Sequence, residues 1–253
     1  MAGLESGLWS VEGGNWKVCK GLLEKSKAIV NKNTQVIEII KKKLDEQQNA
    51  LYFIRTVKSL VSTPFDVVIV ATPLEVRQNF IGCDGCSRWP YQQELGEFHQ
   101  TVATLQKAKL NTSTFKFSKL PETVGTMEKS EICFSSLRQQ TSVLEEKVDD
   151  KEGQVWRVAS MEPLSKECRE KLFSQSQDPK QIIWLAYPHY TPPEKFLPFL
   201  LDEGIFYVNA IERAASAMEM SALSGRNAAM LTGRFLKKGN LSSPKKGEGH
   251  DEL

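Results

Sequence analysis

The sequence lacks any apolar run close to the roughly 20 residues that cross a bilayer. It also lacks an excess of charge of one sign, since its 253 residues carry a formal net charge of +2. These absences argue against a transmembrane segment and against a nucleic-acid binder. The basic clusters at 41–43, 237–238 and 245–246 are better explained as solvated surface. With 40% hydrophobic residues, the chain has enough apolar material for one large domain or two small ones.

Cysteine is scarce as well, and five dispersed residues are too few for a disulfide-built fold. Cys83 and Cys86 form a C-x-x-C pair, a spacing used by zinc sites and by thiol redox centres. No second pair of ligands accompanies them, and Gly82, Gly85 and Pro90 indicate a loop rather than the helix start typical of redox centres. A local disulfide or free thiols are favoured, a redox centre stays open, and no metal site is predicted.

The two ends of the chain differ in what they indicate. The N-terminus has neither the basic segment nor the apolar core of a signal peptide. Residues 250–253, His-Asp-Glu-Leu, form the receptor-read retention signal of the endoplasmic reticulum lumen, and glycosylation sequons at Asn111 and Asn240 fit that compartment. We expect the endoplasmic reticulum lumen (with the lysosome or vacuole as alternative), a retention-signal receptor as partner, and a true N-terminus upstream of Met1.

Apolar periodicity and turn residues predict a mixture of helices and strands. The predicted helices cover residues 13–27, 165–174 and 214–236, and the predicted strands cover residues 34–40, 50–57, 66–72, 99–110, 132–137, 155–158, 182–187 and 205–208. Residues 78–93 and 187–193 are predicted loops. The run Val67–Ala71 is continuously apolar, as in a strand buried on both faces of an α/β sheet. We therefore predict a mixed α/β (α+β) fold, in which one α/β layer is interrupted by a largely antiparallel insertion.

The strongest local signal is the closing strand, turn and helix at 205–236. A helix start carries unpaired N–H groups and partial positive charge, and small residues there let a ligand come close. Such a start suits a phosphate, or the carbonyl edge of a flavin that gains negative charge on reduction. Small residues also suit a core helix packed tightly on a sheet, and the pattern alone favours that plainer interpretation.

The same segment is similar to the C-terminal flavin motif of the amine-oxidase-like flavoproteins. That motif has the form Met-Glu-x-x-x-x-x-Gly-x-x-Ala-Ala, and it is matched by Met218, Glu219, Gly225, Ala228 and Ala229. An acidic residue, Glu212, stands on the preceding turn, as in that group. Met220-Ser221 departs from the group's usual Gly-Ala, which indicates a branch of it.

Longer segments identify the branch. Residues 6–15 (SGLWSVEGGN), 66–74 (DVVIVATPL), 184–194 (WLAYPHYTPPE) and 207–212 (YVNAIE) resemble prenylcysteine oxidases, called farnesylcysteine lyases in plants. The four segments occur in the family's order and span nearly the whole chain.

The resemblance implies the C-terminal part of an FAD-binding Rossmann-like domain, interrupted by a substrate domain. Residues 1–75 would belong to the FAD-binding domain, 76–200 to the substrate domain, and 201–238 to the closing FAD-binding strand and helix, with 239–253 a disordered tail. Family members begin with a Rossmann unit whose G-x-G-x-x-G glycines admit the cofactor pyrophosphate. None of the sixteen glycines here has that spacing. We expect the half of the enzyme that contains this Rossmann unit to lie upstream of Met1, and we expect the 253 residues alone to be inactive.

The resemblance also implies an FAD-dependent thioether oxidase that cleaves prenylcysteine during the degradation of prenylated proteins. Hydride would pass from the prenyl carbon on sulfur to the flavin, and water would then add, giving cysteine and a prenyl aldehyde. Dioxygen would reoxidise the flavin to yield hydrogen peroxide. Because sulfur and the allylic system stabilise the cation, the protein needs only to orient the partners and stabilise charge.

Cofactor contacts follow from the same resemblance. The backbone N–H groups of Ala217 and Met218 would face the flavin edge. Asn209 and Glu212 would lie near the pyrophosphate and ribose. The backbone of Val36 would meet adenine, and the strand end at Thr72 and Pro73 would lie beneath the cofactor. Each of them also has a plain packing or strand-ending interpretation.

Substrate contacts are less defined. Trp184, Tyr187 and Tyr190 are candidates for lining a prenyl channel, although aromatic residues near prolines are more often core. His189 is a candidate water-activating base, although an ordinary hydrogen-bonded loop histidine explains it better. No other catalytic residue is predicted.

Two functions from other classes compete with the oxidase. One is a non-catalytic short form that binds a prenyl-type ligand without flavin. The other is a lumenal thiol oxidoreductase, which would require Cys83 and Cys86 to be exposed and close to a helix start.

Overall fold

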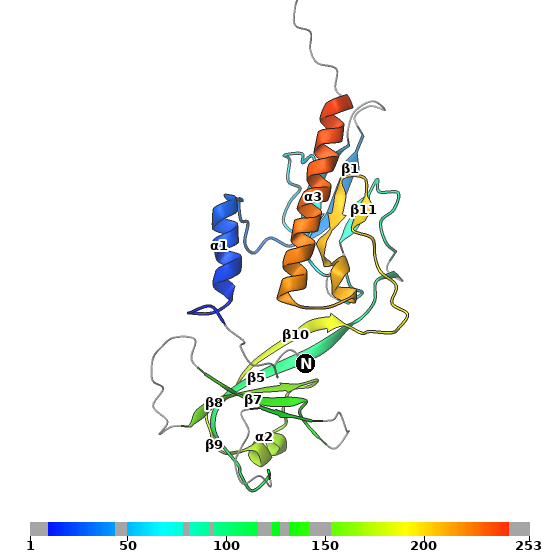
Figure 1. Ribbon diagram of the computed structural model, residues 1–253. Coiled ribbons are helices and arrows are strands. Elements are labelled where there is room, and N and C mark those ends of the chain that lie inside the picture. The colour runs from blue at the N-terminus through cyan, green and yellow to red at the C-terminus, as the bar shows by residue number, and fades with distance from the viewer. Residues whose placement is uncertain are drawn as a thin grey trace, which may run out of the picture. The chain divides into compact units, whose positions relative to one another are not determined.

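The computed structural model (Figure 1) describes residues 10–43, 50–77, 81–91, 94–115, 123–126, 132–141 and 153–242. The chain divides into two compact units, each built from two separate segments. Unit 1 comprises Met1–Asn31 and His99–Ala186, and unit 2 comprises Lys32–Phe98 and Tyr187–Leu253. Among the described residues, no helix combines the length and the apolar character that a membrane span requires.

Unit 2 contains two sheets of three strands each. In the first sheet, β1 (Val36–Lys42) lies between the antiparallel strand β2 (Leu51–Thr56) and the parallel strand β4 (Gly82–Asp84). The β-branched run of β1 favours a strand, and its central Ile39 and Ile40 are buried. β4 is a correction to the sequence analysis, which predicted an irregular loop over residues 78–93.

The second sheet of unit 2 is organised around a parallel pair. β12 (Ile205–Tyr207) pairs in parallel with β3 (Val68–Val70) and antiparallel with β11 (Leu200–Asp202). β3 is therefore an edge strand, and Ile69 at its centre is 46% exposed. Sequence analysis was right that this run forms a strand of an α/β sheet. In this chain the strand is not buried on both faces, because Ile69 is exposed on one of them.

After β12 the chain forms the 3-10 helix η3 (Val208–Arg213) and then the long helix α3 (Met218–Ser242). Figure 1 shows α3 running alongside β11 and the strands next to it. The Phe206 and Phe235 rings meet edge to face, 6.1 Å apart, which joins α3 to β12. The small residues Ser224 and Ala228 are almost fully buried, so part of the predicted small-residue pattern serves close packing. α3 also includes residues 239–242, which we had assigned to a disordered tail.

Unit 1 is built on an antiparallel sheet of six strands, ordered β10-β5-β8-β7-β6 with β9 also paired to β5. The long strand β5 (Phe98–Leu110) is close to its predicted span. The others are β6 (Thr123–Gly125), β7 (Ser136–Gln140), β8 (Gln154–Ser160), β9 (Phe173–Ser176) and β10 (Lys180–Pro188). β7 begins four residues later than predicted, and β6 and β9 were missed because three or four residues carry little periodicity.

The core of unit 1 lies between this sheet and the helix α2 (Lys166–Leu172). The Ser165 hydroxyl caps α2 by accepting a hydrogen bond from the backbone N–H of Cys168, 3.1 Å away. Cys168 and Leu172 are buried, and a disulfide joins Cys168 to Cys133. Sequence analysis missed this disulfide and extended α2 to residue 174, where the chain has already entered β9.

The helix α1 (Trp16–Ser26) was predicted correctly, but its apolar stripe covers nothing in the described chain. None of its residues is buried, and Trp16, Leu22 and Leu23 are about half exposed or more. The mixed α/β class with a largely antiparallel region is confirmed. The predicted boundaries at residues 75 and 200 divide the chain by function and stay predictions.

A buried carboxylate holds the parts of unit 2 together. The side chains of Asp202 and Lys41 are only 2% and 6% exposed, and Lys41 Nζ donates to Asp202 Oδ1 over 2.6 Å. The backbone N–H groups of Ser87, Arg88 and Glu203 donate to the same carboxylate, at 2.6, 2.9 and 2.7 Å. Burial alone would raise the pKa of Asp202, but the hydrogen bonds from Lys41, Arg88 and Glu203 lower it to about 2.

We expect Asp202→Asn to lower the free energy of unfolding by about 3–5 kcal/mol, because the buried Lys41 ammonium loses its partner. A carboxyl with a depressed pKa stabilises the fold above its unfolded pKa, and this contribution is lost as the pH falls. For Asp202 the window runs from 3.8 down to about 2. Denaturant unfolding measured across this pH range should show the loss in the wild type and its absence in the variant.

The matched control is Glu203→Gln, which removes a half-exposed carboxylate 3.5 Å from the same Lys41 ammonium. Because an exposed ion pair contributes little, the control should lose less than about 1 kcal/mol. An equal loss in the two variants would show that the Asp202 carboxylate has no special structural role.

Candidate functional site

The parallel pair β3–β12 places several predicted site residues at one edge of its sheet. Val70 and Tyr207 pair at the ends of the two strands, so Thr72 and Asn209 follow at the same edge. The buried Tyr207 hydroxyl accepts a hydrogen bond from the backbone N–H of Leu74, 3.1 Å away. In open α/β sheets, ligands bind beyond the carboxyl ends of parallel strands. The segments 66–74 and 207–212, far apart in sequence, therefore meet where a ligand site is expected.

Glu212, on η3, carries the most unusual charge environment at this edge. Burial raises the pKa of its carboxyl, and a hydrogen bond from the Asn209 side chain partly opposes that shift. Its Oε2 atom is buried and has no hydrogen-bond partner within the described residues. A buried carboxylate oxygen without a donor is costly, so this atom is suited to accept a hydrogen bond from a ligand.

The loop at 189–194 packs against η3. The Tyr190 hydroxyl donates to the backbone oxygen of Glu212 over 3.1 Å, and Glu194 lies 3.8 Å from Arg213. His189 is fixed through its backbone N–H, which donates to the oxygen of Glu97 over 2.9 Å. A third matched segment thus reaches the same edge, with Tyr190 as its point of contact.

The start of α3 follows η3 after a short exposed turn. Ala217 precedes the first helical residue, Met218, and accepts a backbone hydrogen bond from Ser221 over 3.0 Å. The Ser224 hydroxyl donates to the oxygen of Val208, which fixes this end of α3 to η3. An added Cβ at Gly225 would meet no atom within 4 Å, so nothing in this chain requires a glycine there.

The other predicted site residues lie in several places. Val36 opens β1 and packs against the core of unit 2, two residues before Glu38. Tyr187 belongs to unit 2, whereas Trp184 belongs to unit 1 and lies on β10. Both aromatic side chains are partly exposed, 43% for Tyr187 and 37% for Trp184.

The two sequons also differ in their surroundings. Asn111 lies in the turn after β5, where its side-chain oxygen accepts a hydrogen bond from the Ser113 hydroxyl, 2.7 Å away. Asn240 lies in the last turns of α3, and nothing is described of its side chain. The retention signal at 250–253 lies outside the described residues.

Glu75 is a buried residue near this edge that sequence analysis missed. It lies two residues after Pro73, and its side chain is only 1% exposed. The backbone N–H of Arg77 donates to its Oε1 over 2.9 Å, and the Arg77 guanidinium donates to the backbone oxygen of Phe98. The sequence feature that could have indicated Glu75 is its position shortly after the predicted strand at 66–72.

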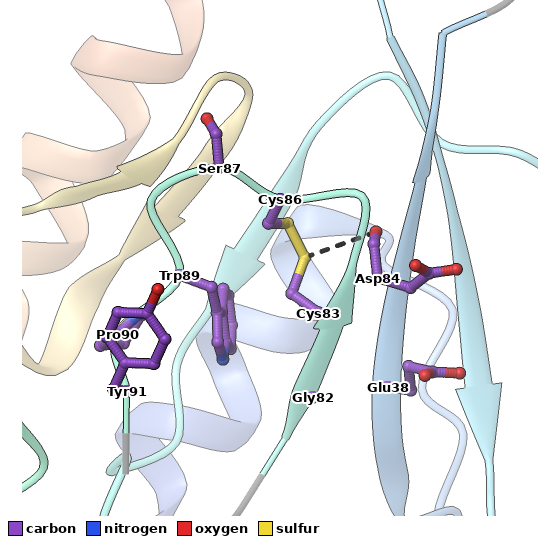
Figure 2. Close-up of a pocket in the computed structure, with 9 residues that line it drawn as sticks. All are labelled: Glu38, Gly82, Cys83, Asp84, Cys86, Ser87, Trp89, Pro90 and Tyr91. Carbon is purple, nitrogen blue, oxygen red and sulfur yellow. Dashed lines mark hydrogen bonds between the residues drawn. A yellow bond between two sulfur atoms is a disulfide. The ribbon is translucent and has the colours of Figure 1, made fainter. Parts of the chain in front are cut away.

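A cavity of about 530 Å³ opens elsewhere in unit 2, beside the Cys83–Cys86 disulfide (Figure 2). Its walls include the carboxylates of Glu38 and Asp84 together with the rings of Trp89 and Tyr91. The Glu38 carboxylate accepts from Arg55 Nε over 2.6 Å, which neutralises part of this acidic lining. None of the predicted cofactor residues lines this cavity, and its carboxylates disfavour an anionic ligand.

The surroundings of the disulfide do not meet the requirements of a thiol redox centre. Cys83 lies on β4, and both cysteines are only half-exposed rather than fully accessible. Neither lies at the start of a helix, where a thiolate would be stabilised. Of the alternatives left open by the sequence, a local loop disulfide is the one found. Within the described residues there is also no cluster of three or more metal-ligating side chains.

Comparison with known proteins gives consistent matches over nearly the whole chain. A sequence model of the prenylcysteine lyase family matches residues 1–242. Human prenylcysteine oxidase 1 is 37% identical over 242 residues, which cover 90% of this chain and 47% of that protein. Farnesylcysteine lyase of Arabidopsis thaliana is 34% identical over 252 residues, which cover 97% of this chain and 46% of that protein.

The chain therefore spans about half the length of the curated relatives that it matches. Mouse prenylcysteine oxidase 1-like protein, at 31% identity over 249 residues, has a similar coverage. Since the family match includes both units and the segments that meet at the β3–β12 edge, the chain belongs to the prenylcysteine lyase family.

Proposed function

We propose that this chain is part of an FAD-dependent thioether oxidase, which cleaves prenylcysteine to a prenyl aldehyde and cysteine and reduces dioxygen to hydrogen peroxide. The names of the relatives support prenylcysteine as the substrate and oxidation as the reaction class. Because this chain covers about half their length, the activity is proposed for the complete enzyme. The observation that carries the proposal is the meeting of three matched segments at the β3–β12 edge.

The residues at this edge fit the sugar and phosphate part of FAD. The unpartnered Oε2 of Glu212 suits a ribose hydroxyl, which is a donor of the kind that atom lacks. Asn209 fixes the same carboxylate and carries a second donor group nearby. Thr72 and Pro73, directly after β3, stay candidates for the floor of the site, and Val36 for the adenine end.

The chain's own contribution to the reaction would be orientation and charge stabilisation. When bound, the flavin would supply hydride acceptance from the carbon next to sulfur. The first N–H groups of α3, from Met218 onward, would favour negative charge placed at the helix start. The hydrogen bond between Tyr190 and the Glu212 backbone would fix the substrate-side loop relative to η3. His189 is held by its backbone and stays a weak candidate for directing water.

We also propose an oxidising lumenal compartment, with the endoplasmic reticulum as first choice. Two disulfides, Cys83–Cys86 and Cys133–Cys168, favour such a compartment. The retention signal at 250–253 and the sequon at Asn111 agree with it. Receptor binding by the C-terminus and glycosylation at Asn111 are parts of the same proposal.

We expect the purified full-length gene product to retain FAD and to oxidise farnesylcysteine. Addition of farnesylcysteine without oxygen should bleach the visible flavin absorbance, and air should restore it with release of hydrogen peroxide. Farnesol, which has no thioether, is the control compound and should cause no bleaching. A protein that binds farnesylcysteine but neither bleaches nor forms peroxide would instead support a non-catalytic prenyl binder.

We expect Met218→Pro to reduce flavin retention without unfolding the protein. Met218 is the first residue of α3, where proline is tolerated and removes only one N–H group. The released flavin is measured after denaturation of equal amounts of protein. Ser242→Pro, at the opposite end of α3, is the control and should retain flavin normally. Equal retention in both variants would place the flavin elsewhere.

We expect Glu212→Ala to reduce flavin retention at least tenfold, because a ribose hydroxyl would lose a charge-assisted hydrogen bond of about 1.5–3 kcal/mol. Glu167→Ala removes an exposed carboxylate from the first turn of another helix, α2, and is the matched control. Flavin content per protein, together with thermal unfolding, distinguishes lost binding from lost folding. Unchanged flavin content in Glu212→Ala would remove this residue from the site.

A further inference from the structure

The sheet of unit 1 has two faces of different character. Val102, Thr104 and Gln106 of β5 are fully buried on the face that α2 covers. Side chains alternate along a strand, so Leu105 lies on the opposite face, where it is half-buried. We call this opposite face, across β7, β8, β5 and β10, the open face of unit 1.

Two arginines stand side by side on the open face. Arg138 of β7 pairs in register with Arg157 of β8, and Arg157 pairs in register with Leu105 of β5. Both arginine side chains are exposed, and neither has an ion pair within the described residues. Like charges directly opposite each other destabilise a sheet, so this pair needs a reason other than the fold. The strand residues that share this face include no aspartate or glutamate.

Apolar side chains continue the open face beyond the arginines. On β10, the Gln181 amide donates to the Thr104 hydroxyl over 3.2 Å, so Gln181 shares the covered face. Alternation along the strand then puts Ile182 and Trp184 on the open face, where they are 57% and 37% exposed. Ile183, which shares the face of Gln181, is 53% exposed as well. A pair of arginines with no ion pair among the described residues is therefore followed, across the same face, by exposed apolar side chains.

We propose that the open face binds the substrate as an amphiphilic anion. Arg138 and Arg157 hold the carboxylate of prenylcysteine, and Leu105, Ile182 and Trp184 contact its prenyl chain. This inference rests on the proposed function, since it takes prenylcysteine as the ligand. Guanidinium groups bind carboxylates with paired hydrogen bonds, which favours arginine over lysine at such a position.

The dimensions of the face agree with this assignment. From Arg138 on β7 to Trp184 on β10, the face crosses three inter-strand spacings, or about 14 Å. An extended isoprenoid chain attached to cysteine can follow that direction, with its carboxylate at one end and its apolar end at the other. Trp184 then makes the prenyl contact for which it was a candidate, while no sequence motif indicated the arginines.

The test measures binding rather than turnover, with the full-length gene product and isothermal titration calorimetry. Farnesylcysteine is compared with its methyl ester, which keeps the thioether and the amino group but loses the carboxylate charge. The double variant Arg138→Gln/Arg157→Gln should bind farnesylcysteine at least tenfold more weakly and bind the ester unchanged. Trp184→Ala should weaken the binding of both ligands. Arg226→Gln, an exposed arginine on α3, is the control and should change neither.

Thermal unfolding distinguishes lost binding from lost folding, because removing two facing like charges should leave the melting temperature of the double variant equal or higher. Unchanged farnesylcysteine binding in the double variant would overturn the inference, and so would an equal loss for acid and ester. A wild type that shows the expected binding pattern but no oxidation would refute the proposed oxidase and leave the binding face standing. A wild type that oxidises farnesylcysteine while the double variant binds it normally would refute the proposed binding face and leave the proposed oxidase standing.

Discussion

Unit 2 depends on the carboxylate of Asp202, which is removed from water and satisfied entirely by the protein. Lys41 supplies the countercharge from β1, Ser87 and Arg88 supply N–H donors from the loop after β4, and Glu203 supplies one from the turn that leads into β12. One side chain thus joins three segments that are distant in sequence. A buried ion pair of this kind adds little net stability, but breaking it leaves an uncompensated charge, so the arrangement is specific.

That arrangement fixes where β12 ends and hence where the candidate site begins. β12 has only three residues, and its register with β3 is maintained by the turn at Gly204, whose φ of +68° few other residues adopt. Tyr52, fully buried, packs against the same turn and donates to the oxygen of Glu203. Because Tyr207 then bonds to Leu74, the positions of Asn209 and Glu212 follow from packing that lies well outside the site.

Sequence alone predicted the elements that carry long or regular patterns, namely β1, β5 and α3. It failed where the pattern is short or the cause is distant. β4 and β11 have three residues each, too few to carry a periodic pattern. The Cys133–Cys168 disulfide spans 35 residues with no spacing signal. At the site, the family motifs indicated Asn209 and Glu212, but only coordinates reveal that Glu212 has an unpartnered oxygen, or that Arg138 faces Arg157.

The exposed apolar residues of the open face and those of α1 and β3 require different explanations. On the open face they accompany two arginines that have no ion pair in the described part of the chain, a combination that suits the proposed amphiphilic ligand. α1 and β3 have no such charge pattern. α1 has an apolar stripe without a single buried residue, and a helix of this length is stabilised mainly by packing. β3 is a parallel edge strand with Ile69 46% exposed, although parallel strands are normally covered on both sides. Both features leave apolar side chains exposed, with no covering element among the described residues. The edge at Glu212 adjoins β3, so the exposed side of β3 borders the proposed cofactor site directly.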